Sequence, residues 1–261
     1  MTIQPRLSEE QHTSTEQVAN SSETIFRPAP QAKTNPFFSY LSKALAIAGK
    51  DIIAEIRTKE MISAMFVFSL LVILVFNFAF DLRAENATVL APGVLWVAIA
   101  FASMLGLGRS FINERDRGSL EGLLLAPVDR SAIYLGKLFG NILFISLVEI
   151  GILPFFMVFF NLPLSILPGL IGVVILGTIG LAGVGTLFSA MVIHTRARDV
   201  LLPIMLFPVT VPVLLSSVRL TAALLDGVPF DEVQKWLALL VAFDAIFMAM
   251  SFMLFDFIVE E

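Results

Sequence analysis

The sequence contains no cysteine and few charged residues, and both shortages exclude whole classes of protein. Without cysteine among 261 residues there can be no disulfide, thiolate metal site, covalent c-type haem attachment or cysteine nucleophile. Charged residues make up only 15%, whereas hydrophobic residues make up 57%; soluble domains have about a quarter charged. A net charge of −5 without a basic cluster argues against nucleic-acid binding. The composition therefore predicts an integral membrane protein.

Residue patterns that support catalysis are also missing from the sequence. There is no G-x-x-x-x-G-K-[ST] phosphate-binding loop, and His12 and His194 offer no paired metal site and no nucleophile triad. Haem ligation by histidine or cysteine inside the membrane is likewise excluded. We expect a non-catalytic chain that binds no metal.

Long gaps between charged residues predict an all-α membrane protein with six transmembrane helices. At about 1.5 Å per residue, each gap can cross a hydrocarbon core about 30 Å thick. The run from Leu138 to Thr195 is too long for one crossing, and the turn signals from Asn161 to Gly169 predict that it folds back. The expected spans are 61–80, 86–108, 134–160, 168–193, 200–218 and 236–259.

Basic residues beside these spans are unevenly divided between the two sides, and the richer side predicts the cytoplasm. Eleven lie on one side: Lys43, Lys50, Arg57, Lys59, Arg109, Arg115, Arg117, Arg130, Lys137, Arg196 and Arg198. Three lie on the other: Arg83, Arg219 and Lys235. We therefore expect both termini in the cytoplasm and outer connections at 81–90, 161–167 and 219–235.

Two segments precede the first span. Residues 1–38 are rich in Ser, Thr, Gln, Glu and Pro, which predicts a disordered cytoplasmic tail. Residues 39–60 predict an amphipathic helix, with an apolar stripe opposite three basic residues. The stripe is Leu41, Leu45, Ala48, Ile52 and Ile56, and the basic residues are Lys43, Lys50 and Arg57. We expect this helix to lie in the cytoplasmic membrane interface; the alternative is packing against protein.

The sequence of the cytoplasmic loop 109–131 predicts a short apolar helix. Ser119 can cap its first turn, Leu120, Leu123 and Leu124 share a face, and Pro127 ends it. This helix is too short to span, so its apolar face must be buried against the bilayer surface, the protein itself or a partner. The residues alone favour none of these.

The same loop, ERDRGSLEGLLLAPVDRSAIYLGK, resembles the E-R-x-x-G-x-L-E-x-L-L-x-[SA]-P segment of multidrug-type and haem-exporter-type ABC permeases. The order of features over 40–261 resembles the CcmB family of cytochrome c biogenesis permeases. Those features are KDIIAEIRTKEMI, LVFNFAF, the loop itself, GTIGLAGVGTLFSAM, RARDVLLPIMLFPVTVPVL and FDFIVEE. Many members carry a His-Trp pair inside the third helix, where this chain has Gly140-Asn141-Ile142, so no role of that histidine is carried over.

The resemblance implies an ABC-2-type permease over 61–259, a subunit of a complex that handles haem for cytochrome c maturation. In such a complex, ATP hydrolysis would be coupled either to haem export or to release of a haem-loaded periplasmic chaperone. A separate CcmA-like ATPase would bind ATP and grip the loop through Glu114, Arg115, Gly118, Leu120, Glu121, Leu124 and Pro127. It also implies CcmC-like and small CcmD-like partners, a homodimer, the bacterial inner membrane, and haem as cargo without covalent attachment. The alternatives are an ABC exporter permease for another lipophilic cargo and a non-transporting scaffold for haem-handling partners.

Polar residues and prolines inside the spans are further candidates. Glu149 and Asp244 are costly in a bilayer, so we expect them to face the bundle interior as part of a pathway or switch. The alternatives are a hydrogen bond between helices and, for Asp244, a place near the outer interface. Pro203, Pro208 and Pro212 predict a kinked fifth helix. The glycines of the fourth helix predict close packing.

Overall fold

The computed structural model describes residues 36–81, 87–110, 130–193, 195 and 197–258. Residues 40–261 form one compact unit. Its helices are α2 (Pro36–Thr58), α3 (Glu60–Asp81), α4 (Ala87–Ser110), α7 (Arg130–Phe159), the 3-10 turn η1 (Leu164–Ile166), α8 (Leu167–Val192), α9 (Arg198–Asp226) and α10 (Phe230–Ile258). Six of them are long and apolar enough to cross a membrane, which confirms the predicted all-α fold class.

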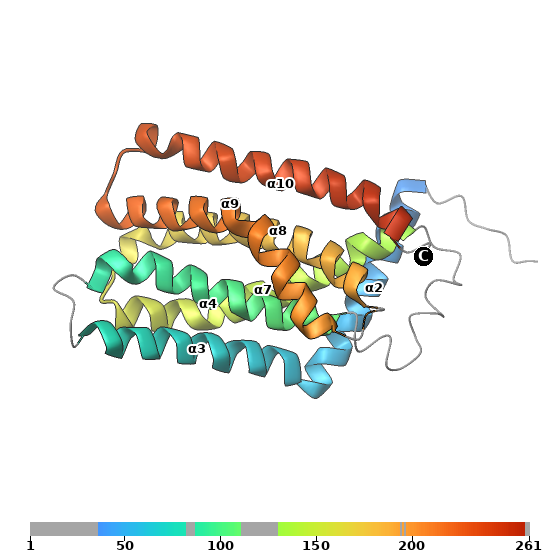
Figure 1. Cartoon of the computed structure of the whole chain (residues 1–261), viewed down its shortest axis with the longest axis horizontal. Coiled ribbons are helices and arrows are strands. Elements are labelled where there is room, and N and C mark those ends of the chain that lie inside the picture. Colours follow the sequence, from blue (N-terminus) through green and yellow to red (C-terminus); the bar gives the residue numbers. More distant parts are fainter. Residues whose placement is uncertain (1–35, 82–86, 111–129, 194, 196, 259–261) are drawn as a thin grey trace, which may run out of the picture. The chain divides into compact units, whose positions relative to one another are not determined.

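The six spanning helices run side by side, and α2 lies across one end of them (Figure 1). α4 is the central helix, because it packs against α3, α7, α8 and α9 and 67% of its span is buried, against 22% for α3 and for α10. α8 packs against α7, α9 and α10.

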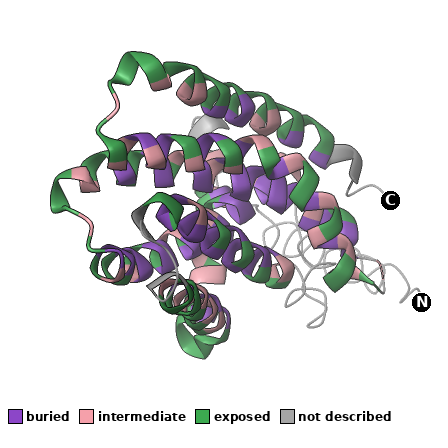
Figure 2. Cartoon of the chain, turned by 60° about the vertical axis from the view of Figure 1, so that its left-hand side comes forward, coloured by how far each residue is buried: buried purple, intermediate pink, exposed green. Residues whose placement is uncertain are grey.

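The outward faces of the helices are apolar as well as exposed. Figure 2 shows buried residues on the inner sides of the helices and exposed residues on the outer sides. The exposed side chains include Val67, Ile150, Val158 and Met253, each at least 60% exposed. Contiguous apolar surface of this kind is unstable in water, so these faces fit lipid.

The predicted connection at 219–235 is wrong in its bounds, since α9 and α10 together leave only 227–229 between them. α9 continues past Arg219 to Asp226 and ends at Gly227, which has φ +66°, and the Val228 N–H bonds back to the Ala223 carbonyl oxygen at 2.9 Å. Glycine adopts this left-handed conformation without steric cost. Arg219 lies inside α9, with its guanidinium carbon 5.8 Å from the centroid of the Trp236 ring. The charged residue at which the predicted span ended therefore does not end the helix.

The junction of α2 and α3 is a tight elbow at Lys59, whose φ is +56°. The Lys59 N–H donates to the Glu55 carbonyl oxygen, and the N–H groups of Met61 and Ile62 both donate to Glu55 Oε1 at 2.9 Å. Glu55 therefore satisfies two amides of the first turn of α3 that have no partner within the helix. This cap fixes the direction in which α2 leaves the bundle.

Close helix packing explains several of the glycines in α8. A Cβ on Gly177 would collide with the Trp96 ring of α4 and lie 3.0 Å from the Ser217 hydroxyl of α9. Gly172, by contrast, has open space around it. A Cβ on Gly180 would likewise collide with Asp244 of α10, and one on Gly185 with Leu107 of α4. The predicted packing is therefore confirmed at Gly177, Gly180 and Gly185, and it does not extend to Gly172.

Candidate functional site

The candidate site is the end of the bundle where α4 stops at Ser110 and α7 begins at Arg130. The segment 111–129 between them holds the predicted ATPase contact. Its residues Glu114, Arg115, Gly118, Leu120, Glu121, Leu124 and Pro127 lie outside the described residues. The described part of the site therefore consists of the end of α4, the first turns of α7 and the helices packed against them; we call this region the base.

Lys137, in the second turn of α7, is the centre of this base. Its side chain is 1% exposed, and its ammonium group donates to Asp51 Oδ2 of α2 at 2.8 Å and to the Ser110 carbonyl oxygen of α4 at 3.1 Å. Lys50 lies 3.5 Å from Asp51 Oδ1 on the more exposed side. A buried ammonium is stable only when it is paired and hydrogen-bonded, so Lys137 ties α7 to both α2 and α4.

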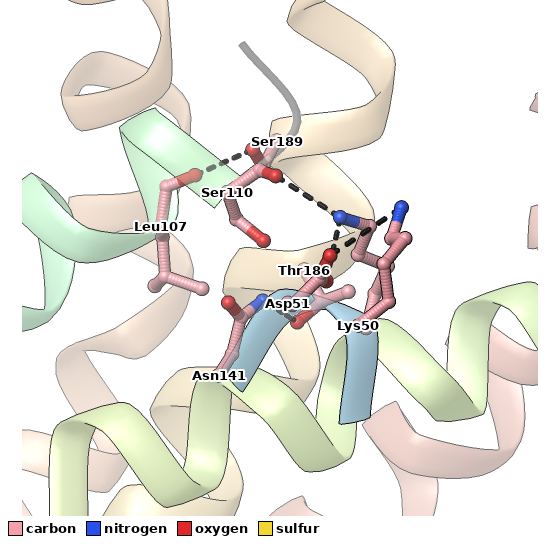
Figure 3. A network of polar contacts seen from close by, with 8 residues as sticks. Lys50, Asp51, Leu107, Ser110, Asn141, Thr186 and Ser189 are labelled. Carbon is pink, nitrogen blue, oxygen red and sulfur yellow. Dashed lines mark hydrogen bonds and ion pairs between the residues drawn. The ribbon is translucent and has the colours of Figure 1, made fainter. Parts of the chain in front are cut away.

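Three polar side chains of α7 and α8 extend this contact. Asn141 Nδ2 of α7 donates to Thr186 Oγ1 of α8 at 2.9 Å, and Ser189 Oγ of α8 donates to the Leu107 carbonyl oxygen at 2.6 Å. Figure 3 shows these residues close to Asp51 and Ser110. We call the set Asp51, Lys137, Ser110, Asn141, Thr186, Ser189 and Leu107 the basal network.

The basal network has a simple physical origin at the end of α4. The last four carbonyl groups of a helix have no partner within it. Two carbonyl groups in the last described turn of α4, at Leu107 and Ser110, accept hydrogen bonds from Ser189 and Lys137. A cation at this end also interacts favourably with the helix dipole. The end of α4 is therefore held by side chains of two neighbouring helices.

The bonds of the basal network join four helices to one another. The basal network includes Ser110, which directly precedes the 111–129 segment, and Lys137, which lies seven residues after the start of α7. Among the described residues, no three His, Asp or Glu side chains form a group that could hold a metal ion. A force on the segment would reach four helices through these bonds.

Sequence reasoning missed the basal network. From the sequence, Lys137 counts only among the basic residues of the cytoplasmic side, although Lys137 follows Gly136 next to a long apolar stretch. A Cβ on Gly136 would collide with the Ala44 carbonyl oxygen and Ile47 of α2. The flanking apolar residues were the available signal that Lys137 is buried.

The two intramembrane carboxyl groups both face the interior, as expected. Glu149 of α7 is 3% exposed and accepts a hydrogen bond from Thr178 Oγ1 of α8 at 2.5 Å. Asp244 is 8% exposed and lies in the middle of α10, which begins six residues earlier than predicted. The alternative of an outer interfacial position for Asp244 is therefore not supported.

The three prolines at the predicted kink all lie inside the single helix α9. Figure 1 shows α9 change direction along its length. Thr210 Oγ1 donates to the carbonyl oxygens of Leu206 and Phe207 at 3.0 and 3.2 Å. A side-chain hydroxyl thus bonds to the helix backbone directly before Pro208. A functional role for Pro203, Pro208 and Pro212 stays a prediction.

An apolar cavity of about 320 Å³ lies between α8, α9 and α10, toward the connection at 227–229. All of its lining residues are apolar, among them Leu176, Leu220, Leu224 and Leu237. The cavity thus offers apolar contact but no side chain that could ligate iron.

Six spanning helices with apolar outer faces and buried polar residues between them define a multi-pass α-helical membrane protein. Comparison with known families is more specific: the family described as "CcmB protein" matches residues 42–258. The chain belongs to the CcmB family.

Named relatives agree with this assignment. "Heme exporter protein B" of Pseudomonas aeruginosa is 30% identical over 67% of this chain and 79% of its own length. The proteins of that name from Rhodobacter capsulatus and Haemophilus influenzae are 26% and 28% identical, over 71% and 68% of this chain and 85% and 80% of their own lengths.

Proposed function

We propose that this chain is the membrane permease subunit of an ABC complex that handles haem for cytochrome c maturation. A separate CcmA-like ATPase supplies the hydrolysis of ATP, and haem is the cargo of the complex. The observation that carries the proposal is membership of the CcmB family over 42–258, with relatives named heme exporter protein B.

The ATPase docks on the 111–129 segment in this proposal. The amphipathic pattern around Leu120 and Leu124 supports docking, and so does the basal network, which includes Ser110 directly before the segment. Glu114 and Glu121 would hold the segment against a basic groove of the ATPase, with Pro127 ending the short helix. Movement of the segment then reaches α2, α4, α7 and α8 together.

The surroundings of the complex follow from the same family and from the distribution of charge. We infer a homodimer in the bacterial inner membrane with both termini in the cytoplasm, next to CcmC-like and CcmD-like subunits. The excess of basic residues beside the ends of α2, α4 and α7 supports this orientation. In this proposal 1–38 is a disordered cytoplasmic tail, 39–60 an interfacial helix, and 61–259 the permease domain with its coupling loop 109–131.

Charge reversal in the segment tests the ATPase contact. With the chain and its candidate ATPase co-expressed, Glu114→Lys combined with Glu121→Lys should lower ATPase recovery on the purified permease without lowering the amount of permease in the membrane. The matched control is Glu60→Lys, an exposed acid in the first turn of α3. Unchanged ATPase recovery in the double reversal would overturn the proposed contact.

A further inference from the structure

Asp244 occupies the most costly position that a carboxyl group can take in this bundle. It lies fourteen residues from Phe230 and fourteen from Ile258, the two ends of α10. By helix rise, each end is about 21 Å away. With 8% of its surface exposed, the side chain points into protein rather than toward lipid or water.

The carboxyl group of Asp244 lies against bare backbone of α8. A Cβ on Gly180 would collide with Asp244 Oδ1, and it would lie 3.0 Å from a methyl group of Val213 on α9. Neither carboxyl oxygen of Asp244 has a hydrogen-bond partner among the described residues. The absence of a side chain at position 180 is what makes room for the group.

A second buried polar atom without a partner lies one turn away along α8. The Ser217 hydroxyl of α9 is 3.0 Å from where a Cβ on Gly177 would be, and it too has no hydrogen-bond partner among the described residues. Asp244 and Ser217 therefore face the same glycine face of α8, defined by Gly177 and Gly180. Buried polar atoms left in this way are expensive and call for a ligand.

No charge in the described part of the bundle is placed to neutralise an Asp244 carboxylate. α8 contains no titratable residue, and those of α9 (Arg198, Asp199, Arg219 and Asp226) are confined to its two ends. On α7, Glu149 is bonded to Thr178 and Lys137 to Asp51, while Arg130 and Tyr134 lie in its first turns. The other charged residues of α10, Asp231, Glu232, Lys235 and Asp256, also lie toward its ends.

The missing ligand of Asp244 is a proton. A metal ion would need several oxygen or nitrogen ligands, and no cluster of three His, Asp or Glu exists among the described residues. An unpaired carboxylate at this depth is strongly disfavoured, whereas a neutral carboxyl group is tolerated. Protonation removes the charge of Asp244 without any further protein group.

We propose that Asp244 is a proton-binding site that holds α10 on the glycine face of α8. With the proton bound, the neutral carboxyl group packs against Gly180 and Val213. When the proton leaves, the carboxylate requires water, and α10 must separate from α8 to admit it. The site is thus a proton-controlled joint of the bundle, and it does not depend on which cargo the complex handles.

The bound proton can be observed directly by infrared spectroscopy of the full chain in lipid vesicles. A protonated carboxyl group has a carbonyl stretch that shifts in heavy water, whereas a carboxylate lacks it. We expect Asp244→Asn to remove one such band at neutral pH. Glu149→Gln serves as the reference for a carboxyl group that has a hydrogen-bond partner. A wild-type spectrum without any band that Asp244→Asn removes would overturn the proton site.

The joint can be tested separately, because the chain has no cysteine of its own. A Cβ on Gly183 of α8 would lie 3.9 Å from Met248 Cε of α10, so Gly183→Cys with Met248→Cys places one thiol on each helix. Cross-linking by a short thiol-reactive reagent should decline as the pH rises from acidic to alkaline, relative to the same pair with Asp244→Asn. The Asp244→Asn pair corrects for the pH dependence of the thiols. A constant ratio between the two would overturn the joint.

Discussion

At the residue scale, the bundle is joined by single hydrogen bonds between buried side chains. Trp96 Nε1 of α4 donates to Thr221 Oγ1 of α9 at 2.9 Å, and Asn141 of α7 donates to Thr186 of α8. Such bonds between membrane helices contribute about 0.6 kcal/mol on average and up to about 1.7 kcal/mol. Close packing against small residues therefore contributes to the association of the helices as much as these bonds do.

Gly180 is the residue whose replacement should be most informative for packing. Gly180→Ala places a methyl group against Asp244 Oδ1 and Val213, so we expect a loss of about 1–3 kcal/mol, the usual range for an overpacked core. Gly172→Ala is the matched control on the same helix, because nothing lies within 4 Å of it. Thermal unfolding in detergent measures both variants. Equal unfolding temperatures for the two would contradict the observed contact between α8 and α10.

The sequence predicted some of these residues and not others, for a physical reason. Glu149 and Asp244 interrupt long apolar runs, and in a bilayer such residues must turn inward. Lys137 lies at the edge of a run, where a lysine is either solvated or paired. The flanking apolar residues indicate burial, but nothing local to Lys137 in the sequence identifies Asp51 of α2 as its partner.

At the element scale, α2 has three faces rather than the two that were predicted. Residues Ala44, Ile47, Ala48 and Glu55 are buried against protein. Leu45, Ile53 and Ile56 are 54%, 57% and 60% exposed and share a second face. Lys43, Lys50 and Arg57 share the third. At about 100° per residue these faces are evenly spaced. One apolar face therefore packs on the bundle and another stays exposed, and the placement of the exposed face in the membrane interface stays a prediction.

The free apolar face of α2 gives a prediction for this helix. Replacing Ile53 and Ile56 by Asp should lower the amount of assembled protein in the membrane, because both charges would enter the interface. The cost is up to about 2.5–3.5 kcal/mol each at the bilayer centre and less at the surface. Quantitative immunoblotting of membranes measures the yield. Ala54→Asp, exposed on the basic face, is the control and should have little effect; an equal loss in both variants would contradict interfacial placement.

Helix ends were the least predictable feature of the elements. The expected spans end at charged residues, yet α9 extends past Arg219, and α10 begins at Phe230, five residues before Lys235. Both cations lie within 6 Å of the Trp236 ring, which allows them to remain in a helix near the membrane boundary. Gly227 does end α9, but it could not be singled out in advance because the sequence contains 16 glycines.

At the scale of the whole molecule, gaps between charges were enough to predict six spans, because a bilayer sets a minimum length for each. The orientation of the bundle remains a prediction from its basic residues. Reporter fusions after Asn86 and Asp226 should report the outer side, whereas fusions after Ser119, Thr195 and Glu261 should report the cytoplasm. A cytoplasmic signal at Asp226 would mean that α9 does not cross.

The central claim is that this chain transmits ATP-driven motion from the 111–129 segment through the basal network to a haem-handling complex. Lys137→Met removes the bonds to Asp51 and Ser110, and Asp51→Asn in the same chain avoids leaving a carboxylate unpaired. Lys50→Met is the matched control, because Lys50 contacts the same aspartate but is 48% exposed.

The most direct measurement is haem loading of the periplasmic chaperone per ATP hydrolysed, by the complete complex in lipid vesicles. We expect the Lys137→Met, Asp51→Asn chain to bind the ATPase and to support hydrolysis while haem loading per ATP is lost. Lys50→Met should preserve both, and Lys137→Arg should restore part of the loading. Haem loading per ATP at the wild-type level in the double variant would contradict the account.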